Sequence, residues 1–245
     1  MKAQKGFTLV ELMIAMLLGL IISGAALQLF LTNQRTFALQ QAQSGLAEDG
    51  HMIIRYITSD LRNAGSGDAA IGTVNPVILD RTDNGTGGGN DTITVQHLSQ
   101  WDYCQGVDLS AGGTNPEGEW TEITYNVRDE TLFCTSDQPV TGTGETAMIS
   151  GVESFQILYG VDREADEELA ITDYITGSAL ASEDVVAAIR FGLVLRSDNN
   201  NLPVPEGANT FQVLDETHTV STADRALRRS FDTTVHIRNY HWEDI

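Results

Sequence analysis

The sequence predicts an α+β fold in which one long N-terminal α-helix packs on an antiparallel β-sheet head. Three observations support this prediction. An apolar run extends from Leu12 to Leu27, an amphipathic stripe with helical spacing continues to Ala64, and short alternating segments separated by turn-forming residues follow Gly65. The 245 residues are enough for this helix and one substantial domain with its own core.

The first eleven residues determine the character of the N-terminal segment. Lys2 and Lys5 form a short basic leader, which holds the start of the chain on the cytoplasmic side of a membrane. Glu11 borders the apolar run, and a carboxylate at the centre of a spanning helix costs roughly 2.5 to 3.5 kcal/mol. We therefore expect a functional role for Glu11 and a positive partner, such as the amine of a new N-terminus.

The stretch Gly6-Phe7-Thr8-Leu9-Val10-Glu11-Leu12 resembles the type III signal sequence of type IV prepilins and of type II secretion pseudopilins. The resemblance implies that a prepilin peptidase cuts after Gly6, that the new amine of Phe7 is N-methylated, and that Glu11 serves subunit assembly. The Phe7 ammonium and Glu11 would then lie about one helical turn apart, within one chain or between staggered neighbours. Pairing between neighbours would set a register, because a misplaced subunit leaves a buried carboxylate without a partner.

Two other interpretations of this segment stay open. An ordinary secretory signal also has a basic start and an apolar core, and Ser23-Gly24-Ala25-Ala26 offers small residues to a different peptidase. A plain signal anchor explains the hydrophobicity but not the spacing of Gly6, Phe7 and Glu11. The carboxylate inside the segment argues against both interpretations.

The helical pattern continues well beyond the membrane-length segment. Apolar and small residues recur every three or four positions on one face, namely Leu39, Ala42, Leu46, Gly50, Ile53, Ile57, Leu61 and Ala64. Gly65-Ser66-Gly67 should end the helix, so a rod of about 85 Å is expected from Phe7 to Ala64. Major pilins usually carry a proline partway along the apolar half, and its absence leaves Gly19 and Gly24 as the evident weak points.

The region after Gly65 has the pattern of an antiparallel β-sheet. The predicted strands are Thr92 to Leu98, Glu122 to Val127, Leu132 to Cys134, Val152 to Tyr159, Ala188 to Arg196, Thr210 to Leu214 and Phe231 to Ile237. Two of them, Ala188 to Arg196 and Phe231 to Ile237, alternate cleanly between apolar and polar residues. We expect a leader at 1–6, a helical spine at 7–64 with about 7–31 in the membrane, and a β-rich periplasmic head at 65–245.

Cys104 and Cys134 are the two cysteines of the chain, and both follow the membrane segment. If the leader stays cytoplasmic, both are exported to a compartment where thiols are readily oxidised. A disulfide between them would close a loop of about thirty residues, worth roughly 3 to 4 kcal/mol. The alternative is a pair of buried free thiols.

Charge and motifs exclude several functions. The formal net charge is −20, and removal of Lys2 and Lys5 with the leader changes it to −22. Such an acidic chain is not expected to bind nucleic acid, which requires clustered Lys and Arg. No hydrolase, zinc-protease or phosphate-loop motif is present, so we expect neither an enzyme nor a bound cofactor.

Two acidic loops have partial resemblance to calcium sites. Asp162, Glu164, Asp166 and Asp173 take the first, third, fifth and twelfth places of an EF-hand-like loop, but Glu167 stands where the turn needs glycine. We interpret these residues as a solvated acidic loop, because clustered carboxylates at a surface turn are common and need no metal. Gly89-Asn90-Asp91 resembles a single turn of a calcium-binding β-roll, which needs stacked copies, so we interpret it as a turn before a strand. No metal site is predicted.

The run from Leu227 to Asn239, together with Val152 to Asp162, resembles the closing strands of PilW-type minor pilins and, more distantly, J-class pseudopilins. The resemblance implies a minor pilin that primes or caps a type IV pilus, held in the inner membrane with a periplasmic head and incorporated into the pilus. The implied partners are other minor pilins, the major pilin, the prepilin peptidase, the inner-membrane assembly machinery and membrane lipid.

Two alternative functions stay open. One is a J-class pseudopilin at the tip of a type II secretion pseudopilus, since the leader chemistry is shared. The other is a membrane-anchored periplasmic binding module or adhesin, which would need a ligand pocket in the head. Another explanation of the C-terminal run is a basic edge strand, in which Arg228, Arg229 and Arg238 balance the acidic surface.

Overall fold

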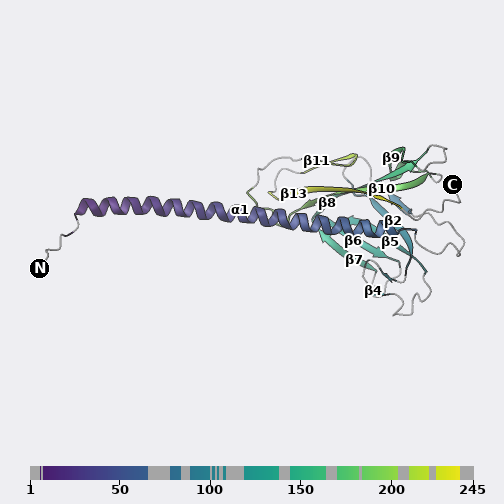
Figure 1. Cartoon of the computed structure of the whole chain (residues 1–245), viewed down its shortest axis with the longest axis horizontal. Helices are drawn as coiled ribbons and strands as arrows, with labels where there is room; N and C mark the ends of the chain where they lie inside the picture. The colour runs from purple at the N-terminus through teal and green to yellow at the C-terminus, as the bar shows by residue number, and fades with distance from the viewer. Residues whose placement is uncertain are drawn as a thin grey trace.

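The computed structural model describes residues 6, 8–65, 78–83, 89–99, 101–102, 104, 107–108, 119–137, 144–163, 170–181, 184–203, 210–220 and 225–237. One helix, α1 (Leu9–Asn63), extends from a β-rich head to the distant N-terminus (Figure 1). The helix is continuous through Gly19 and Gly24, so neither expected weak point interrupts it. The predicted fold class, a long helix with antiparallel β-sheets, is confirmed.

Two larger antiparallel sheets form the head. The first has the order β1-β2-β5-β6-β7, with β1 (Ile78–Thr82), β2 (Thr92–Ser99), β5 (Glu119–Arg128), β6 (Thr131–Ser136) and β7 (Glu145–Ser150). The second has the order β13-β10-β8-β9, with β8 (Val152–Asp162), β9 (Asp173–Thr176), β10 (Val185–Arg196) and β13 (Arg228–His236). A short 3-10 helix, Gly177–Ala179, follows β9.

Two small hairpins complete the described strands. They pair β3 (Trp101–Asp102) with β4 (Val107–Asp108), and β11 (Thr210–Val213) with β12 (Glu216–Thr219). All seven predicted strands are present with shifted ends, whereas β1, β3, β4, β7, β9 and β12 were missed. The missed strands are two to six residues long, and over so few residues alternation is a weak signal.

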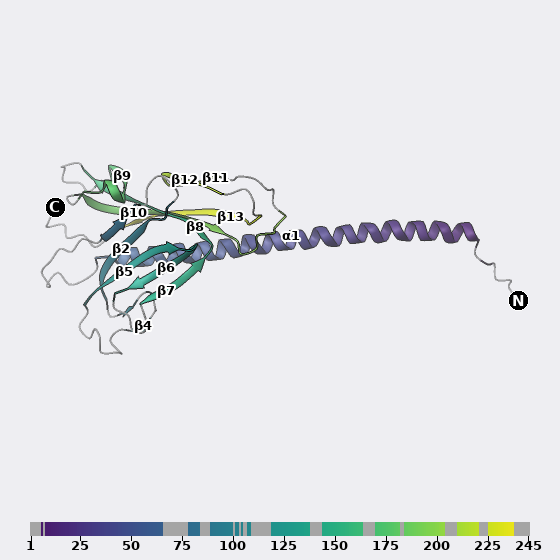
Figure 2. The ribbon, with the colours of Figure 1, turned by 180° about the vertical axis from the view of Figure 1, so that it is seen from behind.

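The last part of α1 lies along the head between the two larger sheets (Figures 1 and 2). Its buried residues are Leu46, Gly50, Ile53, Ile57, Asp60 and Leu61, which confirms the predicted core face from Leu46 onward, whereas Leu39 and Ala42 are only half-buried. The apolar ones, Leu46, Ile53, Ile57 and Leu61, join a single cluster with side chains of both sheets, including Tyr125 and Phe191. Full burial of one such aliphatic side chain contributes about 1.5 to 3 kcal/mol, so packing fixes this half of the helix.

The helix ends where the sequence predicts, at Asn63 with Ala64 as the C-cap. Gly65 has a φ of 72°, a left-handed conformation that glycine adopts without steric cost. Its N–H donates to the carbonyl of Gln96 at 2.7 Å, so the turn is tied directly to β2.

The alternation predicted for β13 is confirmed, but the alternation predicted for β10 is not. Phe191 through Leu195 are all buried, including Gly192 and Val194 on the face expected to be exposed. The β11–β12 hairpin covers that face, and a Cβ on Gly192 would lie 3.1 Å from Val213. The sequence of β10 alone does not predict this packing, because the covering residues come from the β11–β12 hairpin.

The two larger sheets meet at Gly151, between β7 and β8. Gly151 has a φ of +80°, and a Cβ there would lie 2.6 Å from the carbonyl oxygen of Arg196. The Arg196 N–H donates to the Gly151 carbonyl at 2.7 Å. Any side chain at position 151 would push the end of β10 away and so separate the two sheets at this point.

The segment Gly89-Asn90-Asp91 does more than lead into β2. The Asn90 side chain accepts from the Phe155 N–H at 2.7 Å, and the Asp91 carboxylate accepts from the Ile157 N–H at 2.8 Å. These bonds satisfy the part of β8 that lies beyond its pairing with β9. The predicted turn is therefore a strap that joins the five-stranded sheet to the four-stranded sheet.

Candidate functional site

The N-terminal end of α1 contains a capping box. Thr8 is the N-cap, and its hydroxyl accepts from the Glu11 N–H at 3.3 Å. In return, the Glu11 carboxylate accepts from the Thr8 N–H and from the Thr8 hydroxyl, both at 3.0 Å. The carboxylate is therefore turned back toward the start of the helix, where free N–H groups favour negative charge.

The predicted cleavage and assembly residues lie at this end. Gly6 is exposed, two residues before the N-cap, and Glu11 is exposed in the first turn. Phe7 lies outside the described residues, so the predicted pairing of its amine with Glu11 stays a prediction. Sequence reasoning missed Thr8, although the Thr-x-x-Glu spacing before an apolar run predicts a capping box.

The first half of α1, from Leu9 to Phe37, is referred to below as the bare stem. Every described side chain in it is exposed, from Leu9 at 75 % to Phe37 at 67 %. By length and composition, α1 is apolar enough to cross a membrane, and none of its most apolar window is buried inside the protein. An exposed apolar surface of this size needs lipid or another protein to cover it.

The second half of α1, from Leu46 to Leu61, is the docked half, and at Gly50 its backbone comes close to the head. A Cβ on Gly50 would lie 2.3 Å from the Phe231 ring of β13. The same ring makes an edge contact with His51 at 5.7 Å between centroids and lies 5.3 Å from the Arg229 guanidinium. Gly50 is therefore required for β13 to approach the helix this closely.

A buried acid lies on the docked half. Asp60 is 1 % exposed, and its carboxylate accepts a hydrogen bond from the Tyr125 hydroxyl of β5 at 2.9 Å. Burial raises the pKa of Asp60 to about 7, and the hydrogen bond from Tyr125 opposes part of this rise. Burial, followed by the nearby Asp60, also raises the pKa of Tyr125. Sequence reasoning missed Asp60 because it listed only apolar and small residues for the stripe.

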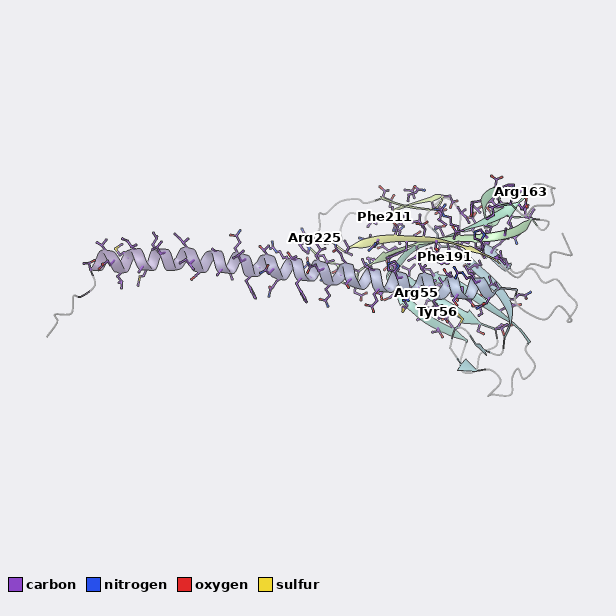
Figure 3. The ribbon with its side chains drawn as sticks, in the orientation of Figure 1. Arg55, Tyr56, Arg163, Phe191, Phe211 and Arg225 are labelled. Carbon is purple, nitrogen blue, oxygen red and sulfur yellow. A yellow bond between two sulfur atoms is a disulfide. The ribbon has the colours of Figure 1, made fainter. Side chains whose placement is uncertain are left out.

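One face of the docked half is not covered by either sheet. In Figure 1 the helix lies in front of the strands, and in Figure 2 it lies behind them. The exposed residues on this open face recur at helical spacing, namely Ser44, Glu48, Met52, Arg55, Ser59 and Arg62. Arg55 is labelled among the exposed side chains of this part of α1 (Figure 3).

A groove of about 400 Å³ lies where the bare stem meets the base of the head. One wall is helical, with Ala38, Ala42 and Asp49, and the other includes the ends of β7 and β10 and the loop carrying Asp198. Burial, followed by the neighbouring Glu48 and Asp198, raises the pKa of Asp49. The groove therefore combines small apolar residues with the charged residues Asp49, Asp198 and Arg196.

Cys104 and Cys134 form a disulfide in the structure. Their Cα atoms lie 5.4 Å apart, across a sequence separation of 30 residues. Cys134 is on β6, and Cys104 is in the segment between β3 and β4. The bond attaches that segment to the five-stranded sheet.

Arg228 does not fit the basic edge strand considered from the sequence. Its side chain is 4 % exposed and donates to both oxygens of Glu153, at 2.7 and 2.8 Å. His218 of β12 lies 3.3 Å from the same carboxylate. Arg228 is thus an internal residue that ties β13 to β8, and Arg238 lies outside the described residues.

The calcium-like loop is described only in part. The Asp162 carboxylate accepts from the Ala170 N–H at 3.0 Å, and Asp173 begins β9. Glu164, Asp166 and Glu167 lie outside the described residues. Within the described part of the chain, no group of His, Cys, Asp or Glu is arranged to hold a metal ion.

Comparisons with known proteins give a family match and a solved structure. The family model of the Type IV Pilus-assembly protein W, PilW, matches residues 117–239, which is half of the chain, and the Prokaryotic N-terminal methylation motif matches residues 1–27. Among solved structures, a type IV-like pilin from Thermus thermophilus is 15 % identical with a TM-score of 0.45, over 79 % of this chain and 96 % of that chain. No curated protein sequence matches the chain.

Proposed function

The chain belongs to the PilW family of type IV pilus-assembly proteins, and we propose from this that it is a minor pilin that primes or caps pilus assembly. The observation that carries the proposal is the division of α1 into a docked half and a bare stem. The head of the chain covers the docked half, whereas lipid or other proteins must cover the bare stem. Such a subunit is suited to lie in a membrane before assembly and among other helices afterwards.

The leader chemistry supplies the start of assembly. In this proposal the prepilin peptidase removes residues 1–6 and the new Phe7 amine is N-methylated, as the N-terminal methylation motif supports. Thr8 already turns the Glu11 carboxylate toward the helix start, which is where the cleaved amine would appear. The Phe7 ammonium and Glu11 would then set the height at which a subunit enters the filament.

The role we propose is structural. The head remains periplasmic before assembly, and the subunit passes from the inner membrane into the pilus with other minor pilins. Its acidic surface favours protein partners over nucleic acid, because clustered carboxylates repel phosphates. The partners are other minor pilins and the major pilin, moved by the inner-membrane assembly machinery.

Replacement of Glu11 with Leu tests the proposal. The variant should insert at least as well as wild type and be cleaved normally, because a carboxylate is lost from an apolar segment. Co-purification of other minor pilins should fall, since the Phe7 ammonium loses its countercharge. Ser23→Leu is the matched control, and Gly6→Lys should remain uncleaved in mass spectra.

Pilus counts distinguish this role from the alternatives. A primer sets the number of pili, so deletion of the gene should reduce the number per cell more than the length of those that remain. Normal recovery of partners and normal pilus number with Glu11→Leu would contradict the proposal. Loss of protein secretion with normal piliation would instead favour a type II secretion pseudopilin.

A further inference from the structure

In the described part of the head, the two larger sheets have four edge strands, and β13 is the longest of them. β9 has four residues, and β1 and β7 have five and six, each with an irregular register against its neighbour. In contrast, β13 has nine residues, contains no proline and pairs with β10 at nine consecutive positions without a bulge. Proteins commonly block sheet edges with short strands, bulges or proline, because a regular free edge is a template for another strand. β13 is therefore the edge at which a strand could be added.

The backbone of β13 has one row of hydrogen-bonding groups that point away from its sheet. The Ile237 N–H donates to the Ala187 carbonyl at 3.0 Å, so the register turns the odd-numbered residues of β13 toward β10. The N–H and C=O groups of the even-numbered residues Ser230, Asp232 and Thr234 therefore face the free edge. All three residues are exposed, and within the described part of the chain no backbone or side chain bonds to these groups.

The flank of α1 beside this edge carries positive charge. His51 makes an edge contact with the Phe231 ring of β13, and the Arg55 guanidinium, one turn further along the same face, donates to the His51 carbonyl at 3.3 Å. On the strand, the Arg229 guanidinium lies 5.3 Å from the same ring, on the side of β13 that faces the helix. All three side chains are exposed. His51, Arg55 and Arg229 are called the basic flank below, and Arg55 is labelled in Figure 3.

The charges of the chain indicate that a partner of the basic flank is acidic. The chain has 34 acidic residues against 14 lysines and arginines, so a carboxylate is within reach of most arginines. The arginines that pair with one in the structure are Arg128, Arg163, Arg190, Arg196 and Arg228. Among the described residues, neither Arg55 nor Arg229 pairs with a carboxylate. Two such guanidinium groups beside an open strand edge favour an incoming carboxylate.

A strand added to β13 would place alternate side chains over the basic flank. On the helix-facing side, these side chains would lie next to Phe231 and Thr233, which point the same way from β13. On the opposite side, Asp232 already pairs with Arg190 at 3.1 Å. The favourable position for acidic side chains is therefore the side that faces α1.

We propose that the free edge of β13 and the basic flank bind an extended acidic segment of a second protein, which adds a strand to the four-stranded sheet. Main-chain hydrogen bonds to Ser230, Asp232 and Thr234 supply affinity, and alternate carboxylates over the basic flank supply selectivity. The inference goes beyond the proposed function, because it concerns the head alone and applies equally to a minor pilin, a pseudopilin or a binding module.

Binding of a designed peptide to the full chain in detergent tests the contact. The probe is a fluorescein-labelled peptide of nine residues, the length of β13, in which glutamate alternates with valine. Its fluorescence anisotropy should rise as the protein is added. The same peptide with lysine in place of glutamate should bind about tenfold more weakly or worse, and a version with methylated backbone nitrogens, which has no N–H donors, should not bind.

Thr234→Pro blocks the edge with little disturbance of the fold. The Thr234 N–H points away from β10, so proline removes no bond of the ladder, and edge strands tolerate proline at such positions. Binding of the acidic peptide should fall about fivefold or more, because one strand bond is lost and the ring obstructs the added strand. A thermal unfolding curve like that of wild type confirms that the head is intact.

Charge reversal tests the basic flank by a route that leaves the strand unchanged. Arg55→Glu and Arg229→Glu should each weaken binding of the acidic peptide by about two- to fivefold, the range expected for exposed ion pairs. The double variant should instead bind the lysine peptide more tightly than wild type does. Arg35→Glu, at an exposed arginine on the bare stem, is the matched control and should bind like wild type.

The outcomes separate this contact from the proposed function. No binding of the acidic peptide, or equal binding by wild type and a folded Thr234→Pro, would overturn the added strand. Equal binding of the glutamate and lysine peptides would overturn the acidic partner. Arg55-dependent binding of a single-stranded oligonucleotide, without binding of the peptide, would assign the basic flank to a nucleic acid and overturn the proposal as well. Pilus number and cleavage at Gly6 test the proposed function independently of these results.

Discussion

The two halves of α1 are built from similar residues but have opposite environments. Ile22 on the bare stem is 68 % exposed, whereas Ile57 on the docked half is fully buried. Both lie in one uninterrupted helix, so helix propensity does not distinguish them. The difference shows that tertiary packing stabilises the docked half, whereas the stem depends on lipid or neighbouring subunits for its cover.

Matched isoleucine-to-alanine substitutions should give the largest difference in stability between the two halves of α1. Ile57→Ala should lower the free energy of unfolding of the head by about 2 to 5 kcal/mol, because it leaves a cavity between the helix and both sheets. Ile22→Ala should leave it unchanged. Urea titration of the full chain in detergent, followed by tryptophan fluorescence, measures both, and equal effects would contradict the division.

Asp60 should make the docked half sensitive to pH. Its pKa is raised from 3.8 to about 7, so the folded state binds this proton more tightly than the unfolded state does. The contribution of Asp60 to stability is complete below pH 4 and is lost as pH rises through 7. Between pH 5 and pH 8 the loss should be about 2 to 3 kcal/mol.

Asp60→Asn should remove this dependence, because the amide keeps the shape of the side chain without the charge. Urea titrations of wild type and variant at pH 5 and pH 8 isolate the contribution as a difference of differences. Asp173→Asn, at an exposed site on β9, is the control for general carboxylate effects. If stability depends on pH in the same way in wild type and Asp60→Asn, the pKa of Asp60 is not raised in the folded protein.

Matched glycine-to-alanine substitutions should change stability in opposite directions in the two halves of α1. Gly50→Ala pushes a methyl group against the Phe231 ring and should cost the head about 1 to 2 kcal/mol, net of the better helix propensity of Ala. Gly19→Ala meets no atom within 4 Å and should stiffen the stem by about 1 kcal/mol. Thermal unfolding of the head and amide exchange along the stem measure the two effects. A Gly50→Ala head as stable as wild type would show that β13 can shift freely.

Loss of the helix cap should have the smallest and most local effect. Thr8→Ala removes the bond to the Glu11 N–H and should weaken the first turn by about 1 kcal/mol. Amide hydrogen exchange should rise at Val10 and Glu11 and stay constant from Leu46 to Leu61. Thr8→Ser retains the hydroxyl and should behave like wild type. Faster exchange in the docked half would mean that the two halves are coupled more tightly than their packing suggests.

The sequence predicted the order and type of the main secondary-structure elements well, because these depend on periodicity and composition. The stripe from Leu46 to Leu61, the end of the helix before Gly65 and the seven predicted strands all follow from spacing and turn residues. The family was also legible, since the run from Gly6 to Leu12 combines a leader with a carboxylate at a fixed distance.

The features that the sequence did not reveal depend on contacts between distant residues. The burial of Asp60 requires Tyr125 from β5, and Arg228 is internal because Glu153 on β8 lies beside it. The strap formed by Asn90 and Asp91 is recognisable only once β8 is known to lie next to it. Thr8 is different, because its Thr-x-x-Glu spacing before the apolar run is present in the sequence.

The uninterrupted path of α1 also has a mechanical consequence. Tension along the rod is carried by the helix backbone, since the membrane end and the head-bearing end belong to one continuous helix. The two sheets lie beside this line of force and would feel a pull only through side-chain contacts such as Gly50 with Phe231. The head can therefore remain folded under axial load, while a twist of the membrane end turns the head with it.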